Sequence, residues 1–325
     1  MKTKNRRTII GIDGTNVAFR YLAIQNPSYP PIVSMLNDIS KICTNLKPDE
    51  LFIAWEGLKS RDARRKIFPD YKANRDVDNK YSFSIKEIKK QVEVFDQYIA
   101  KALPMRQLRI DYLEADDSLA LLSRHYYSAS ENNVVILVST DKDYYQLVNE
   151  RVFVFDPKKR ILHTPKGLFE EFGIKNPKNH AWIKAICGDP ADNIPGVKGI
   201  GFKTFGKLLG DLMISDDVWT VDQIQERMNT WKKPVNMNEI EIFFQIIQLH
   251  KTLTLEGLSQ FNSILTEDFD YEFNDIEFGV IMEQIHKDFI RYNNSMIKRI
   301  AIAMNEFVIR KQIERNSREN YDIIT

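Results

Sequence analysis

Three short apolar runs in this chain each lead into carboxylate residues, and this pattern limits the folds open to the chain. The runs, with the acidic residues that follow them, are Thr8–Ile12 with Asp13, Leu51–Trp55 with Glu56, and Asn133–Val138 with Asp141 and Asp143. Continuous apolar runs of this length are typical of strands that are buried on both faces, as in a parallel sheet covered by helices. The pattern therefore favours an α/β core with acidic groups at the ends of its strands.

The segments between these runs predict helices over residues 31–46 and 84–102 and from Leu113 onward, and Arg106–Ile110 predicts a further strand. Alternating strands and helices form mostly parallel sheets, in which the carboxyl ends of the strands share one edge. Ligands of such sheets usually bind at that edge. The expected fold class is therefore α/β, with a central, mostly parallel sheet and helices on both of its faces.

Further carboxylates stand where they would reach the same edge. Glu114, Asp116 and Asp117 crowd the first turn of a predicted helix, and Asp189 and Asp192 are three residues apart, on one side of a helical turn. Interaction with a helix dipole is the alternative explanation for the first group. The whole set holds nine carboxylates, which repel one another unless cations compensate them. Because hard oxygen ligands select Mg²⁺ or Mn²⁺, the set predicts a divalent-metal site.

Other kinds of catalytic site find little support in the sequence. Cys43 and Cys187 are too few for a zinc site and are expected to be buried, and the five histidines lie apart from the acidic motifs. Ser139 has no histidine near it in the sequence, so a nucleophilic triad is unsupported. Neither a phosphate-binding loop nor a dinucleotide-binding motif is present. The acidic set points instead to two-metal-ion phosphoryl transfer.

Residues 57–90 carry eleven Lys or Arg against five Asp or Glu, a local net charge of +6, with four aromatic residues interleaved. Basic groups combined with stacking rings suit single-stranded nucleic acid, although a solvated charged loop has the same composition. A second candidate contact is the glycine-rich turn Gly196–Gly201, followed by Lys203 and Lys207. Glycines allow a close backbone approach, and helix N-termini favour phosphate; a capped surface helix is the alternative.

The 325 residues allow two domains, expected at 1–187 and 188–325, the second one helical. Helices are expected over residues 221–231, 238–250 and 289–312, where apolar residues recur with a helical period. No apolar run is long enough to span a membrane and no signal peptide is recognisable, so a cytoplasmic protein is expected, in a bacterium or a phage-infected cell. We also expect a monomer.

Five ordered motifs resemble those of the 5′-nuclease (flap endonuclease) superfamily. They are Ile12–Asn16, Pro69–Arg75, Leu113–Asp117, Ser139–Asp143 and Gly188–Asn193. The resemblance covers about residues 8–210 and is strongest to stand-alone bacteriophage 5′–3′ exonucleases and to the N-terminal domain of bacterial DNA polymerase I. It implies a PIN-like core, a helical arch or gateway over residues 57–90, a helix–two-turn–helix motif over residues 188–210 and a helical C-terminal region.

The resemblance also implies roles for single residues. Those at metal-site positions are Asp13, Glu114, Asp116, Asp117, Asp141, Asp143, Asp189 and Asp192, to which Glu56 is added although many relatives have Asp there. Asp13, Glu114, Asp116, Lys72 and Arg75 are expected to be catalytic, the last two as a basic pair that projects from the arch over the active site. The expected DNA contacts are Arg20, Arg61, Arg64, Arg65, Tyr71 (which would stack on a base), Lys72, Arg75, Gly196, Lys198, Gly199, Gly201, Lys203 and Lys207.

The implied activity is hydrolysis of phosphodiester bonds at the 5′ flaps or 5′ ends of DNA or RNA–DNA, with two Mg²⁺ (or Mn²⁺) ions roughly 4 Å apart. A K⁺ ion held by the helix–two-turn–helix motif, a role in replication and primer removal, and a single-strand-binding protein as partner are further expectations. Two alternatives stay open. One is a structure-specific DNA-binding protein without catalysis, and the other is a ribonuclease of the related small nuclease-domain class, whose chains are usually much shorter.

Overall fold

A six-stranded sheet forms the centre of the computed structural model, which describes residues 6–20, 31–77, 90–95, 99, 102–249, 254–267, 272–288 and 294–322. The strands lie in the order β3-β2-β1-β4-β5-β6. Their bounds are β1 Arg7–Asp13, β2 Glu50–Trp55, β3 Arg106–Arg109, β4 Asn133–Val138, β5 Val152–Asp156 and β6 Ile161–His163. The strands expected from the apolar runs are therefore present.

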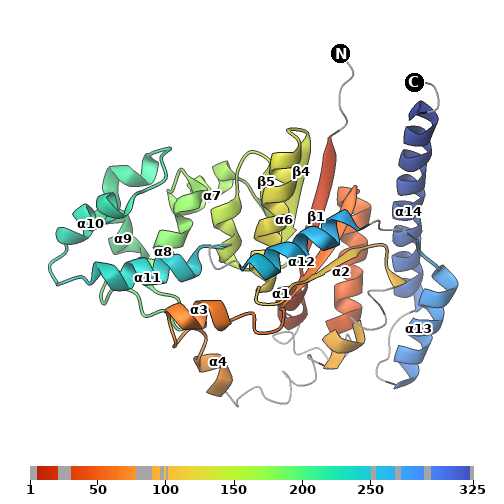
Figure 1. Cartoon of the computed structure of the whole chain (residues 1–325), viewed down its shortest axis with the longest axis horizontal. Coiled ribbons are helices and arrows are strands. Elements are labelled where there is room, and N and C mark those ends of the chain that lie inside the picture. Colours follow the sequence, from red (N-terminus) through yellow and green to blue (C-terminus); the bar gives the residue numbers. More distant parts are fainter. Residues whose placement is uncertain are drawn as a thin grey trace.

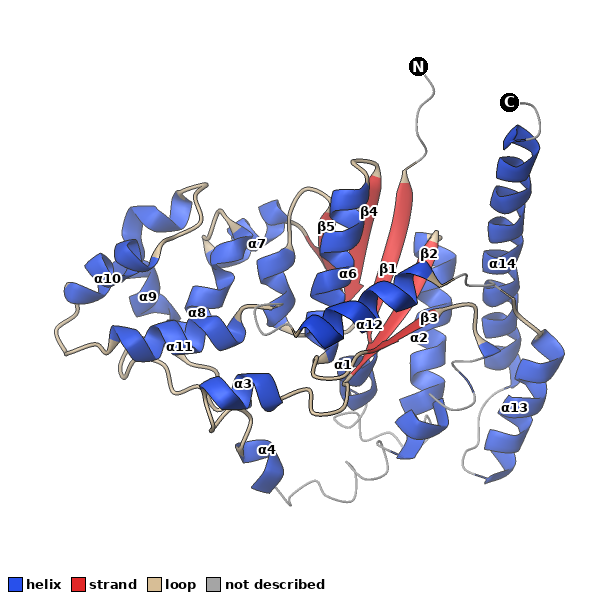
Figure 2. Cartoon of the chain, in the orientation of Figure 1, coloured by secondary structure: helices blue, strands red, loops and turns tan. Residues whose placement is uncertain are grey.

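The first five strands of the sheet are parallel, and only β6 runs antiparallel to its neighbour β5. In the register of the sheet, Asp13 lies opposite Ala54 on β2, and Ile12 lies opposite Val138 on β4. The three strands therefore end at the same edge, near the helices α1 (Gly14–Arg20) and α3 (Asp62–Ile67) in Figure 2. The acidic residues that follow these strands are brought to one side of the molecule, as the sequence predicted.

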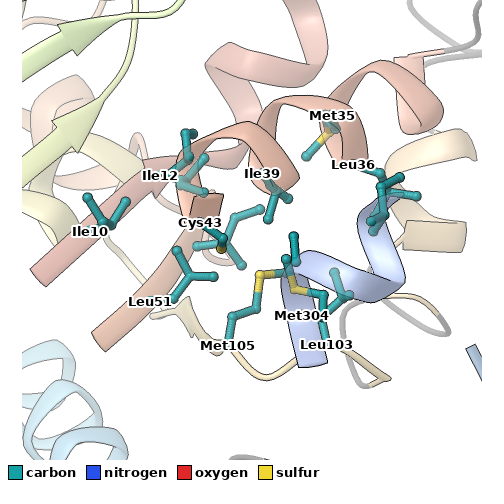
Figure 3. Close-up of a cluster of buried hydrophobic side chains, with 14 of the residues drawn as sticks. Ile10, Ile12, Met35, Leu36, Ile39, Cys43, Leu51, Leu103, Met105 and Met304 are labelled. Carbon is teal, nitrogen blue, oxygen red and sulfur yellow. The ribbon is translucent and has the colours of Figure 1, made fainter. Parts of the chain in front are cut away.

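One face of the sheet is covered by helices from both ends of the chain. They are α1, α2 (Pro31–Leu46), α13 (Asp275–Asp288) and α14 (Asn294–Asp322). Ile10 and Ile12 on β1 pack with Met35 and Leu36 on α2 and with Met304 on α14 in one buried cluster (Figure 3). The last helix of the chain thus completes the core on which the first strand lies.

The opposite face is covered by α6 (Ala115–Ala129) and α12 (Leu255–Thr266), which cross in front of the strands in Figure 1. Leu119 and Leu122 on α6 pack against Ile9 on β1 and Leu137 on β4, and Phe261 on α12 joins the same cluster. The expectation of helices on both faces is confirmed. Among the helices that the structure describes, none is long and apolar enough to cross a membrane.

A separate helical lobe lies beside the sheet, at the left of Figure 1. Its helices are α8 (His180–Cys187), α9 (Phe202–Leu209), α10 (Val221–Asn229) and α11 (Met237–Ile247). Trp182, Phe205 and Phe243 are buried in its own hydrophobic cluster, and the ring of Trp182 stacks on Phe244 with 3.7 Å between the centroids. The lobe begins before the sequence motif that was expected to open the second domain.

The domain boundary expected at residue 187 differs from this arrangement. The lobe already includes α8, and α12, α13 and α14 return from it to cover both faces of the sheet. The C-terminal region is helical, as expected, but it contributes to the core of the sheet. Of the residues expected to form the arch, 78–89 lie outside the described residues. The described part before them contains the two short helices α3 and α4 (Asn74–Val77).

Candidate active site

Asp13 ends β1 with its carboxylate held from three directions. Its Oδ1 accepts a hydrogen bond from the backbone N–H of Asn16 (2.8 Å), and its Oδ2 accepts from the hydroxyls of Tyr144 (2.9 Å) and Ser139 (3.2 Å). Burial raises the pKa of Asp13 to about 6, with a contribution from the nearby charge of Asp141. The hydrogen bonds thus fix the position of this carboxylate. Because its pKa is raised, a nearby cation would stabilise its charged form.

Glu56 follows β2 at the same edge of the sheet. Burial, followed by repulsion from Glu114, raises the pKa of Glu56 to about 7. Within the described part of the chain, its buried Oε2 has no hydrogen-bond partner. A buried carboxylate oxygen without a partner costs free energy unless a cation or a proton binds it. Glu56 therefore has an oxygen available for a metal ion, in spite of its departure from the expected Asp.

The N-terminus of α6 supplies Glu114, Asp116 and Asp117, whose carboxylate oxygens lie within 4.8 Å of one another. Arg64 from α3 reaches this group and is only 1% exposed. Its guanidinium donates to Oε2 of Glu114 (2.5 Å) and to both oxygens of Asp117 (2.7 and 2.9 Å). Burial raises the pKa of Asp116 well above its usual range, in spite of the opposing charge of Arg64.

Glu114 has two further partners from the segment that follows α3. The hydroxyl of Tyr71 donates to its Oε2 (2.8 Å) and the ammonium of Lys72 donates to its Oε1 (2.6 Å). Burial by itself would raise the pKa of Glu114, but the charges of Arg64 and Lys72 outweigh it and lower the pKa to about 2. Glu114 is thus ionised across the physiological range, while its neighbours Asp116 and Glu56 resist losing their protons.

A second acidic group combines residues from the end of β4 with residues from the turn after α8. Oxygens of Asp143, Asp189 and Asp192 lie within 4.8 Å of one another. The turn is closed by the paired backbones of Asp189 and Ile194, and the side chain of Asp189 caps the short helix η7 (Pro190–Asp192). Burial raises the pKa of Asp143 to about 7, and repulsion from Asp141 and Asp192 adds to this shift.

The second group contains a cation that the sequence did not indicate. Lys184, on α8, places its ammonium nitrogen 2.8 Å from Asp189 Oδ2, 3.7 Å from Asp141 Oδ1 and in contact with Asp143 Oδ1. Burial disfavours the charged lysine, but Asp143 and Asp141 hold its pKa well above the usual range. The carboxylates and the lysine therefore form one mutually compensating cluster.

Lys72 and Arg75 connect the two acidic groups. Lys72 Nζ, bonded to Glu114, lies 3.9 Å from Asp192 Oδ1, and Arg75 donates to the same oxygen over 2.9 Å. Asn74 donates to the carbonyl of Pro190 (2.8 Å), so the segment that begins at Pro69 is tied to the turn after α8. Residues that are far apart in sequence thus close one side of the site.

The donor set fits divalent cations. Oxygen is the only ligand type in both groups, Glu56 offers an unpartnered oxygen, and burial keeps the pKa values of Asp13, Glu56 and Asp143 near 6 or 7. Mg²⁺ and Mn²⁺ prefer such ligands, and a bound cation lowers the pKa of a carboxylate next to it. The arrangement can therefore hold divalent ions at the carboxyl edge of the sheet.

Three of the expected DNA contacts have a different environment in the structure. Arg64 is buried between Glu114 and Asp117 and also donates to the carbonyl of Ile246 (2.8 Å), so it cannot meet DNA on the surface. Tyr71 is 2% exposed, which leaves no ring face for a base. Lys72 does not project from an arch; it lies in the floor of the site and is 7% exposed. Each of these side chains bonds to the buried carboxylate of Glu114, and this interaction offsets the cost of removing its polar group from water.

The remaining candidate contacts lie nearer to the surface. Arg75 keeps 45% of its side chain exposed, and Lys198, Lys203 and Lys207 are exposed along the turn and α9. Arg61 and Arg65 are half-buried, and Arg65 donates to the carbonyl of Tyr71 (3.1 Å). Arg20 is the last residue of α1, and its side chain lies outside the described residues. Their contacts with DNA stay predictions.

The glycines of the turn between α8 and α9 differ in what they permit. Gly196 has φ +63°, and a Cβ there would lie 2.3 Å from the backbone nitrogen of Gly188, so only glycine fits. Gly199 also has a positive φ (+92°) and is exposed, and around Gly201 nothing lies within 4 Å of where a Cβ would be. The first glycine is therefore required by folding, while the last one leaves open space beside the N-terminus of α9.

Sequence reasoning missed Lys184, Tyr144 and the structural use of Ser139. Lys184 is a single lysine on a short apolar helix. The sequence indicates its contact with Asp189 only through its position about a turn and a half before that residue. Ser139 is the first residue of the Ser139–Asp143 motif and Tyr144 directly follows it, where the end of β4 lies beside that of β1. Recognising their bonds to Asp13 requires the pairing of these two strands, which the sequence motif alone does not give.

Comparison with known proteins places this geometry in a family. Residues 8–173 match the family model of the 5′–3′ exonuclease, N-terminal resolvase-like domain. A 5′-3′ exonuclease of Buchnera aphidicola is 32% identical over 214 residues, which cover 63% of this chain and 70% of that protein. DNA polymerase I of Thermus thermophilus is 27% identical over 254 residues; the match covers 76% of this chain but 29% of the polymerase, so the chain spans about a third of such relatives.

Solved structures share the fold. A bacteriophage T5 flap endonuclease variant in complex with DNA and metal ions superposes with a TM-score of 0.59 at 20% identity, covering 85% of this chain and 98% of that one. T5 5′-exonuclease with bound zinc gives a TM-score of 0.58 at 20% identity and covers 93% and 100% of the two chains. These similarities extend across both the sheet and the helical lobe.

Proposed function

Because this chain belongs to the 5′–3′ exonuclease family, we propose that it is a divalent-metal-dependent 5′-nuclease that acts as both 5′–3′ exonuclease and flap endonuclease. Its substrate would be DNA, or RNA–DNA, with a 5′ single-stranded flap or a 5′ end, and its place would be in replication and primer removal. The observation that carries the proposal is the pair of acidic groups at the carboxyl edge of the sheet, joined by Lys72 and Arg75.

The residues that would hold the metal ions fall into two sets. The first ion would be held by Asp13, Glu56, Glu114 and Asp116, with Asp117 beside them, and the second by Asp141, Asp143, Asp189 and Asp192. Mg²⁺ is the ion we propose, with Mn²⁺ as its substitute. When bound, such ions supply Lewis-acid polarisation of a phosphate and an activated water.

The chain's own cations would neutralise charge as the phosphodiester is cleaved. Lys72 is fixed between Glu114 and Asp192, and a fixed cation needs no reorganisation when charge develops on phosphate oxygens. Arg75 is partly exposed beside it and would meet the incoming strand. Buried partners thus orient Lys72, whereas Arg75 can also contact the substrate from the surface.

The duplex part of the substrate would bind over α9 and the turn before it. Lys203 and Lys207 are exposed one turn apart on α9, and Gly199 and Gly201 expose backbone to a phosphate. We propose that backbone carbonyls of this turn also hold a K⁺ ion. The distance between this surface and the acidic groups along α8 would set where the 5′ strand is cut.

The test uses a DNA with a labelled 5′ flap, incubated with wild type, Asp143→Asn and the matched control Asp216→Asn, whose carboxylate is exposed in the helical lobe. We expect cleavage near the flap junction with Mg²⁺, binding without cleavage with Ca²⁺, and loss of cleavage in Asp143→Asn alone. Tight binding without cleavage in Mg²⁺ or Mn²⁺ would favour a non-catalytic DNA-binding protein and contradict the proposal.

A further inference from the structure

The second acidic group differs from the first in the kind of cation that compensates it. Asp143, Asp189 and Asp141 all contact one flexible lysine, Lys184, whose side chain is 22% exposed. We propose that Lys184 is the built-in counter-cation of this group, and that a divalent ion binds there only by displacing its ammonium. The inference rests on the proposed function in one respect, since it takes the second group to be a metal site.

The ammonium occupies space that a metal ion needs. The oxygens of Asp143 and Asp189 that could bind an ion lie within 4.8 Å of each other and of Asp192, and Lys184 Nζ contacts both of these side chains. A lysine ammonium has three donors and no acceptor, so it cannot itself become a metal ligand. Two cations that share the same carboxylates repel each other, so binding of the ion and retention of the lysine exclude one another.

The structure provides a place for the displaced side chain. A cavity of about 350 Å³ adjoins the acidic group, and both Asp143 and Lys184 line it. Its other walls include Phe172 and Phe202, and Lys142 already places its ammonium 5.6 Å from the centroid of the Phe172 ring. Aromatic faces attract ammonium groups, and the four-carbon stem of lysine is flexible enough to reorient.

The first acidic group lacks such a movable cation among its described contacts. Arg64 is 1% exposed and bonds to Glu114, Asp117 and the carbonyl of Ile246, and Lys72 is held between Glu114 and Asp192. Both cations contact Glu114, and their charges keep its pKa low, while among the described residues Glu56 Oε2 is left unpartnered. The two groups should therefore take up metal differently: the first without displacing a residue, the second in competition with Lys184.

The experiment titrates the full chain with Mn²⁺ in the absence of DNA and follows bound Mn²⁺ by electron paramagnetic resonance. Lys184→Met is compared with wild type and with Lys142→Met, which removes a lysine from the same cavity. Because the charge of the ligand set controls cation affinity, we expect the weaker Mn²⁺ site to tighten by about tenfold or more in Lys184→Met. In Lys142→Met it should stay within about twofold of wild type, since that lysine lies over Phe172.

Thermal unfolding gives a second readout without activity. Metal-free Lys184→Met should unfold at a lower temperature than wild type, because Asp141, Asp143 and Asp189 lose their cation, and Mn²⁺ should raise its midpoint more than that of wild type. If Lys184→Met does not fold without metal, Asp141→Asn restores the net charge of the cluster. The tightening should then persist in Lys184→Met/Asp141→Asn compared with Asp141→Asn alone.

Equal Mn²⁺ affinity in wild type and Lys184→Met would overturn the inference, whether or not DNA binding had weakened; weakened DNA binding alone would make Lys184 a phosphate contact. Failure of the proposed function would look different. In that case wild type would not cleave flap DNA in Mg²⁺ or Mn²⁺, whatever the effect of Lys184→Met on Mn²⁺ affinity.

Discussion

The ammonium nitrogen of Lys72 lies 2.6 Å from Oε1 of Glu114, and this ion pair joins the segment after α3 to the N-cap of α6. Both side chains are nearly buried, at 7% and 1% exposure. The same nitrogen lies 3.9 Å from Asp192, so one lysine faces both acidic groups. Its positive charge would therefore attract a phosphate bound between the two acidic groups.

Replacing Lys72 by Met should slow the release of 5′ nucleotides from duplex DNA by about 100-fold or more, since it removes a fixed cation from the site. The measurement is single-turnover cleavage in Mg²⁺, with Lys66→Met as control because Lys66 is exposed on α3. A loss of similar size in Lys66→Met would instead indicate general attraction of DNA to the basic segment.

Replacing Arg64 by Met should destabilise the protein by about 3–5 kcal/mol, because Glu114 and Asp117 would be left buried without their partner. Urea unfolding of the metal-free protein measures this. Arg64→Lys should recover only part of the loss, since lysine cannot reproduce the two bonds to Asp117. A normal free energy of unfolding combined with weak DNA binding would show that Arg64 is a DNA contact after all.

The stability of the metal-free protein should fall as the pH rises from about 4 to 7. Burial raises the pKa of Asp13 from 3.8 to about 6, that of Glu56 from 4.5 to about 7 and that of Asp143 from 3.8 to about 7. In that window the folded state holds protons that the unfolded chain has lost, so the free energy of unfolding decreases with pH.

Thermal unfolding at pH 5.5 and pH 8 with and without Mg²⁺ checks this pH dependence. The rise in the midpoint of unfolding that Mg²⁺ causes should be larger at pH 8, where protons compete less for the carboxylates. Asp13→Asn should flatten the pH dependence, because it removes one of the carboxyl groups whose pKa burial raises. Glu114 works in the opposite sense: its pKa of about 2 adds stability that is lost only as the pH falls below about 4.5. Stability that rises steadily from pH 5.5 to 8 would contradict the prediction.

Gly196→Ala and Gly201→Ala should separate folding from DNA binding. At Gly196 a methyl would collide with the backbone of Gly188, and the positive φ disfavours alanine, so a loss of about 2 kcal/mol or more is expected. At Gly201 there is open space and φ is −94°. Because Gly201 is the N-cap of α9, its replacement should lower the free energy of unfolding by at most about 1 kcal/mol, the usual effect of changing an N-cap residue. Duplex DNA binding by Gly201→Ala should nevertheless weaken, because the methyl projects where a phosphate would approach. Unchanged affinity would remove this turn from the interface.

Lys203→Met and Lys207→Met should each lower the salt dependence of duplex binding by about one unit in the slope of log K against log salt. Both lysines are exposed on α9. Lys166→Met is the control, since Lys166 is exposed on α7 (Pro165–Phe172), where it pairs with Glu170. Equal slopes for all four proteins would place the duplex elsewhere.

The edge of the sheet could be predicted because its signals are local. Apolar runs of strand length ended at Asp13, Glu56 and Asp141, and the parallel register brings those ends together. The fold class followed from the same alternation of strands and helices. The return of α12, α13 and α14 to the sheet was not predicted, because an amphipathic helix shows that it has a buried face but not which surface covers it.

The inward positions of Arg64, Tyr71 and Lys184 could not be read from the sequence. A basic or aromatic residue in a charged stretch normally faces solvent, and Arg64 and Tyr71 are buried because carboxylates from a distant segment bond to them. Lys184 is only partly buried, and it faces inward because Asp141, Asp143 and Asp189 surround its ammonium. Tyr71 and Arg64 meet Glu114 from more than 40 positions away in the chain. Composition showed that the segment was basic, but it could not show which of the cations were already engaged.

The chain closes its core with its last helix, and this has a consequence for how the protein is made. Ile10, Ile12, Met35 and Leu36 leave the ribosome well before Met304 and Phe307, which complete their cluster. While the residues between them are being translated, the nascent chain therefore carries an apolar surface that α14 does not yet cover. Production of this protein should accordingly depend on translation speed and on chaperones that shield nascent chains, more than for a protein whose first strands are covered by the helices that directly follow them.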